Sequence, residues 1–291
     1  MFRIGIVGSD NSHAIAFSQL LNREEGYNGM RLEGARVTHL WGVEPERNEE
    51  VAELGEIPHI TETTEEMMGG VDGIICVLRD GALHKDAVMP FLKAGMPVFV
   101  DKPLATTVAD VDAMLDTAQR TGVGFSSFST LRFEHGYQEW IAEARENEGN
   151  AITGVSTGPG DLESQYSGIF FYGIHAVELM LERWGYGVEA VTAVPSGRSV
   201  QAVCRYDNGL LVTLNLVNGG RQGFRLYSFG DSGASEHTVD TRTNYRDGLT
   251  IALDVLREGA WPLTPDQLRE PVQILAAIDE SVSSGQTVTL A

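Results

Sequence analysis

Short apolar runs alternate with amphipathic stretches along the first half of the chain. The apolar runs are Phe2–Val7, Ala35–Val43, Val71–Leu78, Met96–Val100 and Val123–Phe128. The stretches with helical spacing are Ala14–Leu21, a segment that opens at Pro45, Thr64–Met68, Asp86–Ala94 and Thr107–Arg120. Strands that alternate with helices at this spacing predict an α/β fold, in which a doubly wound parallel sheet carries helices on both faces.

The pattern changes beyond Ser126, where segments of alternating apolar and polar residues follow a helical stretch. The alternating segments are Ile152–Thr157, Val188–Val194, Val200–Tyr206, Leu210–Val217 and Phe224–Phe229. Asp207-Asn208-Gly209 has the composition of a hairpin turn, and Gly219-Gly220 is a second turn signal. Helices are expected at 133–145, 250–257 and 266–283. We therefore predict a Rossmann-type domain over residues 1–126 and an α+β domain with an open, mostly antiparallel sheet over 127–291.

The first strand leads into a polar turn and then a helix. Gly8 closes the strand, and Ser9, Asp10, Ser12 and His13 lie in or just after the turn. A strand, a turn and a helix in this order form the first half of a nucleotide-binding unit, whose helix N-terminus offers N–H groups to phosphate. These five residues are therefore candidates for cofactor binding.

Asp101-Lys102-Pro103 follows a strand that has the apolar composition of a buried one. Ligands of doubly wound sheets bind beyond the carboxyl ends of the strands, so Asp101 and Lys102 are expected at a ligand site. The chain has three lysines against eighteen arginines. A lysine in such a chain suggests that a compact, titratable ammonium is needed. The alternative is a hydrated lysine at the rim of the sheet.

Together these motifs resemble the Gfo/Idh/MocA family of nicotinamide-dependent oxidoreductases. The resemblance rests on the Gly5–Gly8 strand end, on Asp101-Lys102-Pro103, on Arg132-Phe133 and on Gly173-Ile-His175-Ala-Val-Glu178. It implies NAD or NADP as cofactor, with NAD slightly favoured, and a small hydroxylated or keto substrate such as a sugar or polyol derivative. It also implies that Lys102 hydrogen-bonds the reacting oxygen and that His175 is the acid or base.

The turn after the first strand departs from the family fingerprint Gly-x-Gly-x-x-Gly. Asp10 and His13 occupy the second and third glycine positions. A carboxylate there adds bulk and negative charge where a pyrophosphate is expected. A protonated His13 and the hydroxyls of Ser9 and Ser12 could offset that charge. Alternatively, Asp10 or Ser12 only caps the first helix.

The acid that binds the adenosine ribose in the family is also missing. Gly42 stands at its position, and Glu44 is the candidate to replace it. Arg47 could instead meet a 2′-phosphate. The alternative is that Glu44 and Glu46 are acids favoured in a first helical turn by the helix dipole.

His175 is expected to begin the helix His175–Trp184, where the helix dipole favours a neutral imidazole. Glu178 would lie on the same helix face and could orient the ring or contact the substrate. The alternative is a histidine packed in the core. Phe171 replaces a family Asp, so Tyr172 is the candidate for the missing catalytic donor.

Ser127, Arg132 and Tyr166 are further candidates for substrate binding. Two other classes of function also stay open at this stage. The protein could be a binding or regulatory protein on the same fold, or a relative that uses NAD to cleave a glycosidic substituent.

Composition limits the partners. The formal net charge of −20 argues against nucleic acid, which requires basic patches. No export leader and no long apolar segment is evident, so a cytoplasmic protein without a membrane partner is expected. Cys76 and Cys204 lie in apolar segments and are expected to be buried thiols, and no metal site is expected. The open face of the second sheet predicts a homodimer or homotetramer.

Overall fold

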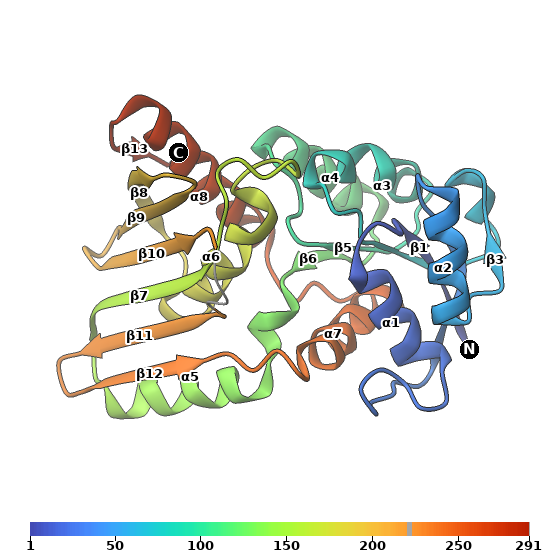
Figure 1. Cartoon of the computed structure of the whole chain (residues 1–291), viewed down its shortest axis with the longest axis horizontal. Helices are drawn as coiled ribbons and strands as arrows, with labels where there is room; N and C mark the ends of the chain where they lie inside the picture. Colours follow the sequence, from blue (N-terminus) through green and yellow to red (C-terminus); the bar gives the residue numbers. More distant parts are fainter. Residues whose placement is uncertain (220–222, 291) are drawn as a thin grey trace. The chain divides into compact units, whose positions relative to one another are not determined.

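The chain folds into two compact units in the computed structural model, which describes residues 1–219 and 223–290 (Figure 1). The first unit comprises Met1–Ala105, Ala109–Phe128 and Tyr245–Pro265. The second comprises Thr106–Val108, Ser129–Asn244 and the chain from Asp266 onward. The predicted boundary after residue 126 differs from this division because the segment Tyr245–Pro265, expected in the second domain, packs in the first unit.

The first unit is built on a parallel sheet of six strands in the order β3-β2-β1-β4-β5-β6. The strands are β1 (Phe2–Val7), β2 (Ala35–Trp41), β3 (His59–Ile60), β4 (Gly73–Cys76), β5 (Val98–Asp101) and β6 (Phe125–Phe128). All residues of β4, β5 and β6 are buried, as expected for parallel strands covered on both faces. The predicted Rossmann-type fold is confirmed.

The helices of this unit are α1 (Ser12–Asn22), α2 (Pro45–Gly55), α3 (His84–Lys93), α4 (Val108–Thr121) and α7 (Asn244–Glu258). Residues Glu65–Met67 and Gly81–Leu83 form single 3₁₀ turns. The predicted helix at 64–68 is therefore only a short turn.

Helix α7 returns to the first sheet because of its apolar face and the small residues that it meets. Leu249, Ala252 and Val255 are buried, at helical spacing. A Cβ at Gly124 would overlap the Val255 carbonyl, and one at Gly73 would lie 3.3 Å from the Leu256 side chain. The glycines thus make room for the helix.

The second unit contains a mixed sheet of seven strands in the order β12-β11-β7-β10-β9-β8-β13. The strands are β7 (Ala151–Pro159), β8 (Val188–Ser196), β9 (Ser199–Tyr206), β10 (Leu211–Val217), β11 (Arg225–Gly230), β12 (Ala234–Thr238) and β13 (Val288–Thr289). Only the β7–β10 pair is parallel among those described. This confirms the prediction of a mostly antiparallel sheet.

The predicted hairpin turn at Asp207-Asn208-Gly209 joins β9 to β10. The Tyr206 amide donates to the Leu210 carbonyl over 2.9 Å, and Gly209 has a φ of 86°. The other turn signal, Gly219-Gly220, lies partly outside the described residues because Gly220 is not described.

Helices α5 (His135–Asn147), α6 (Phe170–Trp184) and α8 (Pro265–Ser284) complete the second unit. Helix α6 packs on β7 and β10 (Figure 1), where a Cβ at Gly154 would overlap the Trp184 indole. The strands bury alternate residues toward this helix, including Val212, Leu214 and Leu216 on β10.

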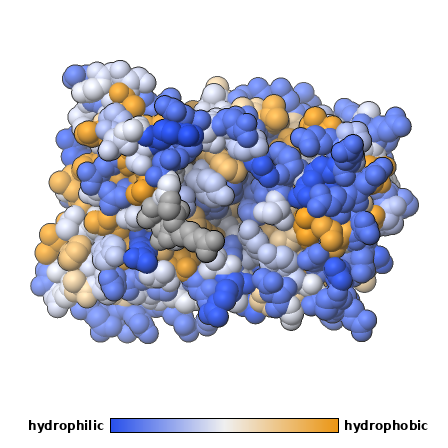
Figure 2. Space-filling model, viewed as in Figure 1, coloured by the Kyte–Doolittle hydropathy of each residue, from blue (hydrophilic) through white to orange (hydrophobic). Residues whose placement is uncertain are grey.

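The surface is predominantly hydrophilic in the view of Figure 2, with smaller and separate hydrophobic patches. That distribution matches the acid-rich composition. Among the described residues, no helix combines the length and the hydropathy that crossing a bilayer requires.

Candidate functional site

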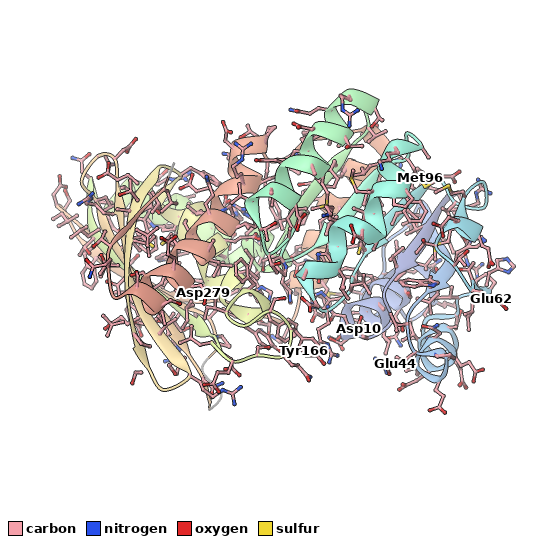
Figure 3. The ribbon with its side chains drawn as sticks, turned by 90° about the horizontal axis from the view of Figure 1, so that it is seen from above. Asp10, Glu44, Glu62, Met96, Tyr166 and Asp279 are labelled. Carbon is pink, nitrogen blue, oxygen red and sulfur yellow. The ribbon has the colours of Figure 1, made fainter. Side chains whose placement is uncertain are left out.

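The carboxyl ends of the first sheet collect the residues predicted to bind a cofactor. In Figure 3, Asp10 and Glu44 lie at the carboxyl ends of the strands, since they follow β1 and β2. Met96, which precedes β5, lies at the opposite end of the sheet. Gly8 has a φ of 110°, and a Cβ there would lie 2.6 Å from the Leu78 amide nitrogen. Only glycine fits this position, because the turn after β1 touches the backbone after β4.

Asp10 does not cap the first helix. The N-cap of α1 is Asn11, whose side-chain oxygen accepts a hydrogen bond from the His13 amide. Asp10 instead accepts from the Arg79 amide, at 3.1 Å to Oδ2 and 3.3 Å to Oδ1, and Arg79 Nη2 donates to the Asp10 carbonyl. The proposed capping role of Asp10 or Ser12 is therefore wrong.

His13 faces a carboxylate. Its Nδ1 lies 2.7 Å from Oδ2 of Asp101, and both side chains are buried. Asn11 Nδ2 donates to the same oxygen over 3.5 Å. The ring also packs edge-on against Tyr245, with centroids 4.8 Å apart. In this structure His13 thus pairs with Asp101, and its expected role beside a phosphate stays a prediction.

Lys102 follows Asp101 directly and is also buried, at 3 % exposure. This burial argues against the alternative of a hydrated lysine at the rim of the sheet. Ser127, the third residue of β6, is 5 % exposed and pairs with Val100 of β5. Lys102 and Ser127 therefore both lie near the carboxyl end of this sheet, where a ligand is expected.

His84 is fully buried at the start of α3 and contacts two loops. Its Nδ1 lies 2.7 Å from the Pro103 carbonyl oxygen, and its Nε2 lies 2.8 Å from the Leu78 carbonyl oxygen. Burial lowers the pKa of His84 below its usual value, against the opposing effects of these carbonyls and of Asp101. The imidazole holds the segment after β4 against the one that carries Lys102.

The end of β2 differs from the expectation for Glu44. Glu44 occupies the N-cap position of α2 without a capping bond and is exposed. Arg47 Nε donates to the Ser9 carbonyl over 3.0 Å, so this cation lies beside the first turn. The positions of Glu44 and Arg47 do not distinguish ribose binding from phosphate binding, so both roles stay predictions.

Gly42 lines a pocket of about 690 Å³ together with Trp41, Asn48, Ile60 and Glu62. A Cβ at Gly42 would overlap Ser9 Oγ and Asn48 Oδ1. Both atoms are buried and have no hydrogen-bond partner within the described chain. The side chains of Ser9 and Asn48 therefore occupy the space that the first side-chain atom of an acid at position 42 would need.

His175 lies inside α6 and not at its start. The helix begins at Phe170, five residues before the prediction. Gly173 does not break it, because this glycine makes room for Ile169, Leu216 and Leu275. The expected effect of the helix N-terminus on His175 is therefore weaker than predicted, since such effects decay within the first turn.

Ser129 forms a hydrogen bond with His175, with 2.6 Å between Oγ and Nδ1. Glu178, predicted to orient the ring, accepts from the Ser129 amide over 2.8 Å. Its carboxylate thus holds the backbone of the residue that contacts His175.

Arg132 is fully buried and belongs to an ionic cluster. Its guanidinium donates to Glu182 over 2.8 Å and to the Tyr186 hydroxyl over 2.6 Å, and lies 3.5 Å from Glu178. Burial alone would lower the pKa of Arg132, but Tyr186 and the two carboxylates raise it overall. We therefore expect Arg132 to support Glu178 and not to contact a substrate as predicted.

The loop between β7 and α6 lines a pocket of about 550 Å³. Tyr166, Phe171 and Tyr172 form an aromatic wall, with neighbouring ring centroids 5.0 and 4.6 Å apart. Asp161 and Arg198, joined by a hydrogen-bonded ion pair, supply charge. Figure 3 shows Tyr166 on this loop. The pocket combines apolar rings with polar groups, as small-molecule sites do.

Three residues at these sites were not singled out as functional: Asn11, Arg79 and His84. The sequence signal for Arg79 was its place directly after a buried strand, the same signal that identified Lys102. Among the described residues, no group of three or more His, Cys, Asp or Glu side chains could hold a metal ion.

Comparison with known proteins finds matches to part of the chain. Residues 2–128 match the model of the Gfo/Idh/MocA family, described as an oxidoreductase family with an NAD-binding Rossmann fold. A 2,7-anhydro-N-acetylneuraminate hydratase from Mediterraneibacter gnavus is 31% identical over 106 residues. That match covers 36% of this chain and only 27% of the relative.

Solved structures resemble the whole chain. A myo-inositol 2-dehydrogenase from Lactobacillus plantarum has a TM-score of 0.83 at 16% identity and covers 100% of this chain and 99% of its own. A scyllo-inositol dehydrogenase from Lactobacillus casei, solved with NAD(H) and scyllo-inositol, has a TM-score of 0.83 at 14% identity and covers 99% of both chains. At such identities the likeness shows the fold.

Proposed function

We propose that this chain, whose residues 2–128 match the model of the Gfo/Idh/MocA oxidoreductase family, is an NAD(P)-dependent dehydrogenase of a small hydroxylated or keto compound such as a polyol or sugar derivative. One observation carries the proposal. The Gly8 turn and buried Lys102 both lie at the carboxyl end of the first sheet, the edge where such sheets bind their ligands.

The residues at this edge fit a dinucleotide. Gly8 provides the tight turn, and the N-terminus of α1 offers N–H groups to a phosphate. Arg47 and Arg79 place two cations on the backbone of the same turn. A nicotinamide dinucleotide, when bound there, supplies the redox chemistry. We favour NAD slightly over NADP, and an inositol dehydrogenase of the same fold was solved with NAD(H) bound.

Lys102 and His175 are the proposed proton-handling residues. The Lys102 ammonium would donate a hydrogen bond to the reacting oxygen and stabilise negative charge on it. His175, oriented through Nδ1 by the Ser129 hydroxyl, would present its other nitrogen as acid or base. Tyr172, which is 44% exposed and one helical turn before His175, is the proposed additional donor.

The pocket beside Tyr166 and Tyr172 is the proposed contact surface for the substrate. Its aromatic wall suits the C–H faces of a ring, and the Asp161 carboxylate suits hydroxyl donors. The relatives with inositol as substrate make cyclic polyols the first compounds to test.

A turnover assay with NAD or NADP and a panel of inositols and sugars tests this function. Lys102→Met and His175→Ala should each reduce the rate by roughly 10²–10⁴-fold, as loss of general acid–base groups does. The exposed residues provide matched controls, Lys93→Met and His135→Ala, which should retain the rate. If the two residues serve one transition state, the double variant should lose little more than either single one.

A second candidate is a reaction without net redox change, which the hydratase relative favours. In that case the protein should retain NAD through purification and convert its substrate while the bound NAD stays oxidised. Steady accumulation of reduced nicotinamide would exclude this candidate. Calorimetry that shows no binding of NAD or NADP would instead favour a binding protein on the same fold.

A further inference from the structure

The point where the first sheet reverses its winding is spanned by two charged residues. The strand order makes β1 and β4 central neighbours, and ligands of open α/β sheets bind in the crevice outside such a pair. Asp10 follows β1 and Arg79 follows β4. We call their two-way contact the Asp10–Arg79 bridge.

In this bridge each side chain binds the other residue's backbone. The Asp10 carboxylate accepts from the Arg79 amide, and the Arg79 guanidinium donates to the Asp10 carbonyl. The carboxylate is therefore directed to the loop after β4, while the guanidinium lies on the turn after β1. Both residues are partly exposed, so a ligand can reach them.

The two loops are also held together by their backbones. A Cβ at Gly8 would come within 2.9 Å of three backbone atoms of Val77 and Leu78. The turn after β1 thus has little freedom to move away from the residue that precedes Arg79. The position of the guanidinium follows from this close approach as well as from its own hydrogen bond.

We propose that Arg79 is the phosphate-binding cation of this chain and that Asp10 positions it. The inference rests on the proposed dinucleotide function. Where the family has a glycine, Asp10 adds a side chain that hinders close approach of phosphate to the backbone. The guanidinium replaces that contact, because its planar set of N–H donors matches two phosphate oxygens at once. It also balances the carboxylate charge.

Calorimetry with ADP and with NAD as probes tests the role of Arg79. Arg79→Gln should weaken the binding of both by about 10- to 100-fold, the range for a lost hydrogen bond to a charged group. Added salt should weaken binding to the natural protein more than to the variant, because salt screens the guanidinium charge. Arg79→Lys should recover part of the affinity.

Arg3→Gln is the matched control. Arg3 belongs to β1 but precedes its carboxyl end by four residues and pairs with Asp72 at the protein surface. This variant has the same loss of charge and should bind ADP unchanged. If natural protein binds ADP or NAD and Arg79→Gln binds as tightly, the inference is wrong while the proposed function stands. If the natural protein binds no dinucleotide, the proposed function fails first.

Variants of Asp10 test the positioning role. Asp10→Asn keeps an oxygen that can accept from the Arg79 amide and removes a negative charge, so ADP should bind at least as tightly. Asp10→Gly removes the acceptor and should bind several-fold more weakly than Asp10→Asn. Equal affinities of the two variants would overturn the positioning role, and the salt response of each shows whether Arg79 still contributes.

Discussion

Gly42 is interpreted differently from the sequence and from the structure. In the sequence, Gly42 stands where the family has a ribose-binding acid, which suggests that Asp at this position would restore ribose binding. In the structure Ser9 Oγ and Asn48 Oδ1 occupy the space that such a side chain needs, and both are buried. Absence of the acid is therefore part of the local packing.

We expect Gly42→Asp to destabilise the protein and not to improve NAD binding. The overlap with Ser9 and Asn48 should cost about 1–3 kcal/mol, as overpacking of a filled site does. Urea unfolding measures the loss. Ser9→Gly should recover part of it in the double variant, and Val43→Asp, at a neighbouring residue that is 69% exposed, should change stability little. Unchanged stability of Gly42→Asp would show that the two side chains move aside.

At this scale, the sequence cannot distinguish between neighbouring residues whose side chains can make the same local hydrogen bond. Asp10, Asn11 and Ser12 can all cap a helix, and nothing in the sequence selects Asn11. Arg79 is 69 residues from Asp10, so their contact depends on the sheet order. Gly8 and Lys102 could be placed because strand ends alone indicate their position.

At the scale of elements, strands were predicted better than the ends of helices. Val100 and Leu216 lie in strands as expected because apolar alternation or continuity marks them directly. The start of α6 was misplaced by five residues because Gly173 resembles a helix boundary, whereas it makes room for packing. The short strand β3 was missed, since His59–Ile60 is only two exposed residues.

His84 connects two elements of the first unit and should make the stability depend on pH. Burial lowers its pKa in the folded state below the unfolded value of about 6.5. The unfolded chain then binds more protons than the folded one, so stability is highest above pH 6.5 and decreases as the pH falls through the folded pKa. Urea midpoints between about pH 5 and 8 should show this slope, and His84→Phe should reduce it.

Two further outcomes separate titration of His84 from its hydrogen bonding. At pH 8 the neutral imidazole has one N–H and donates to only one of the Leu78 and Pro103 carbonyls. His84→Phe removes that hydrogen bond, so it should also be destabilised at pH 8, by about 1–3 kcal/mol. Burial also lowers the pKa of His39. His39 therefore contributes equally to the pH dependence of stability in the natural protein and in His84→Phe, and its contribution cancels when the two are compared. A variant with the full slope of the natural protein would assign the pH dependence to other groups.

At the scale of the whole molecule, the alternation of strands and helices was sufficient to predict both sheets. It was not sufficient to assign Tyr245–Pro265 to the correct unit, because the sequence does not show against which sheet a helix with one apolar face will pack. The contacts of α7 with Gly73 and Gly124 decide this, and they form only after the sheet has assembled.

The second sheet has an open face with apolar residues in register. The pairing of β9, β10, β7 and β11 aligns Val203, Thr213, Val155 and Tyr227 in one row. The next row contains Arg205, Leu211, Thr153 and Phe229. Leu211 and Phe229 are 44% and 43% exposed, and Figure 2 shows hydrophobic residues among hydrophilic ones over these strands. Such a face is suited to covering by a second copy of the chain.

We expect this face to form the interface of a homodimer or homotetramer. A stable interface buries about 800 Å² on each partner, an area that several strands of one sheet can provide. Leu211→Glu with Val203→Glu would place one negative charge in each row, where two symmetry-related copies would bring like charges together. Sedimentation velocity should then show dissociation to the monomer, while Val43→Glu in the first unit should retain the oligomer. A natural protein that sediments as a monomer at micromolar concentration would contradict the expectation, and an unchanged oligomer in the double variant would place the interface on another surface.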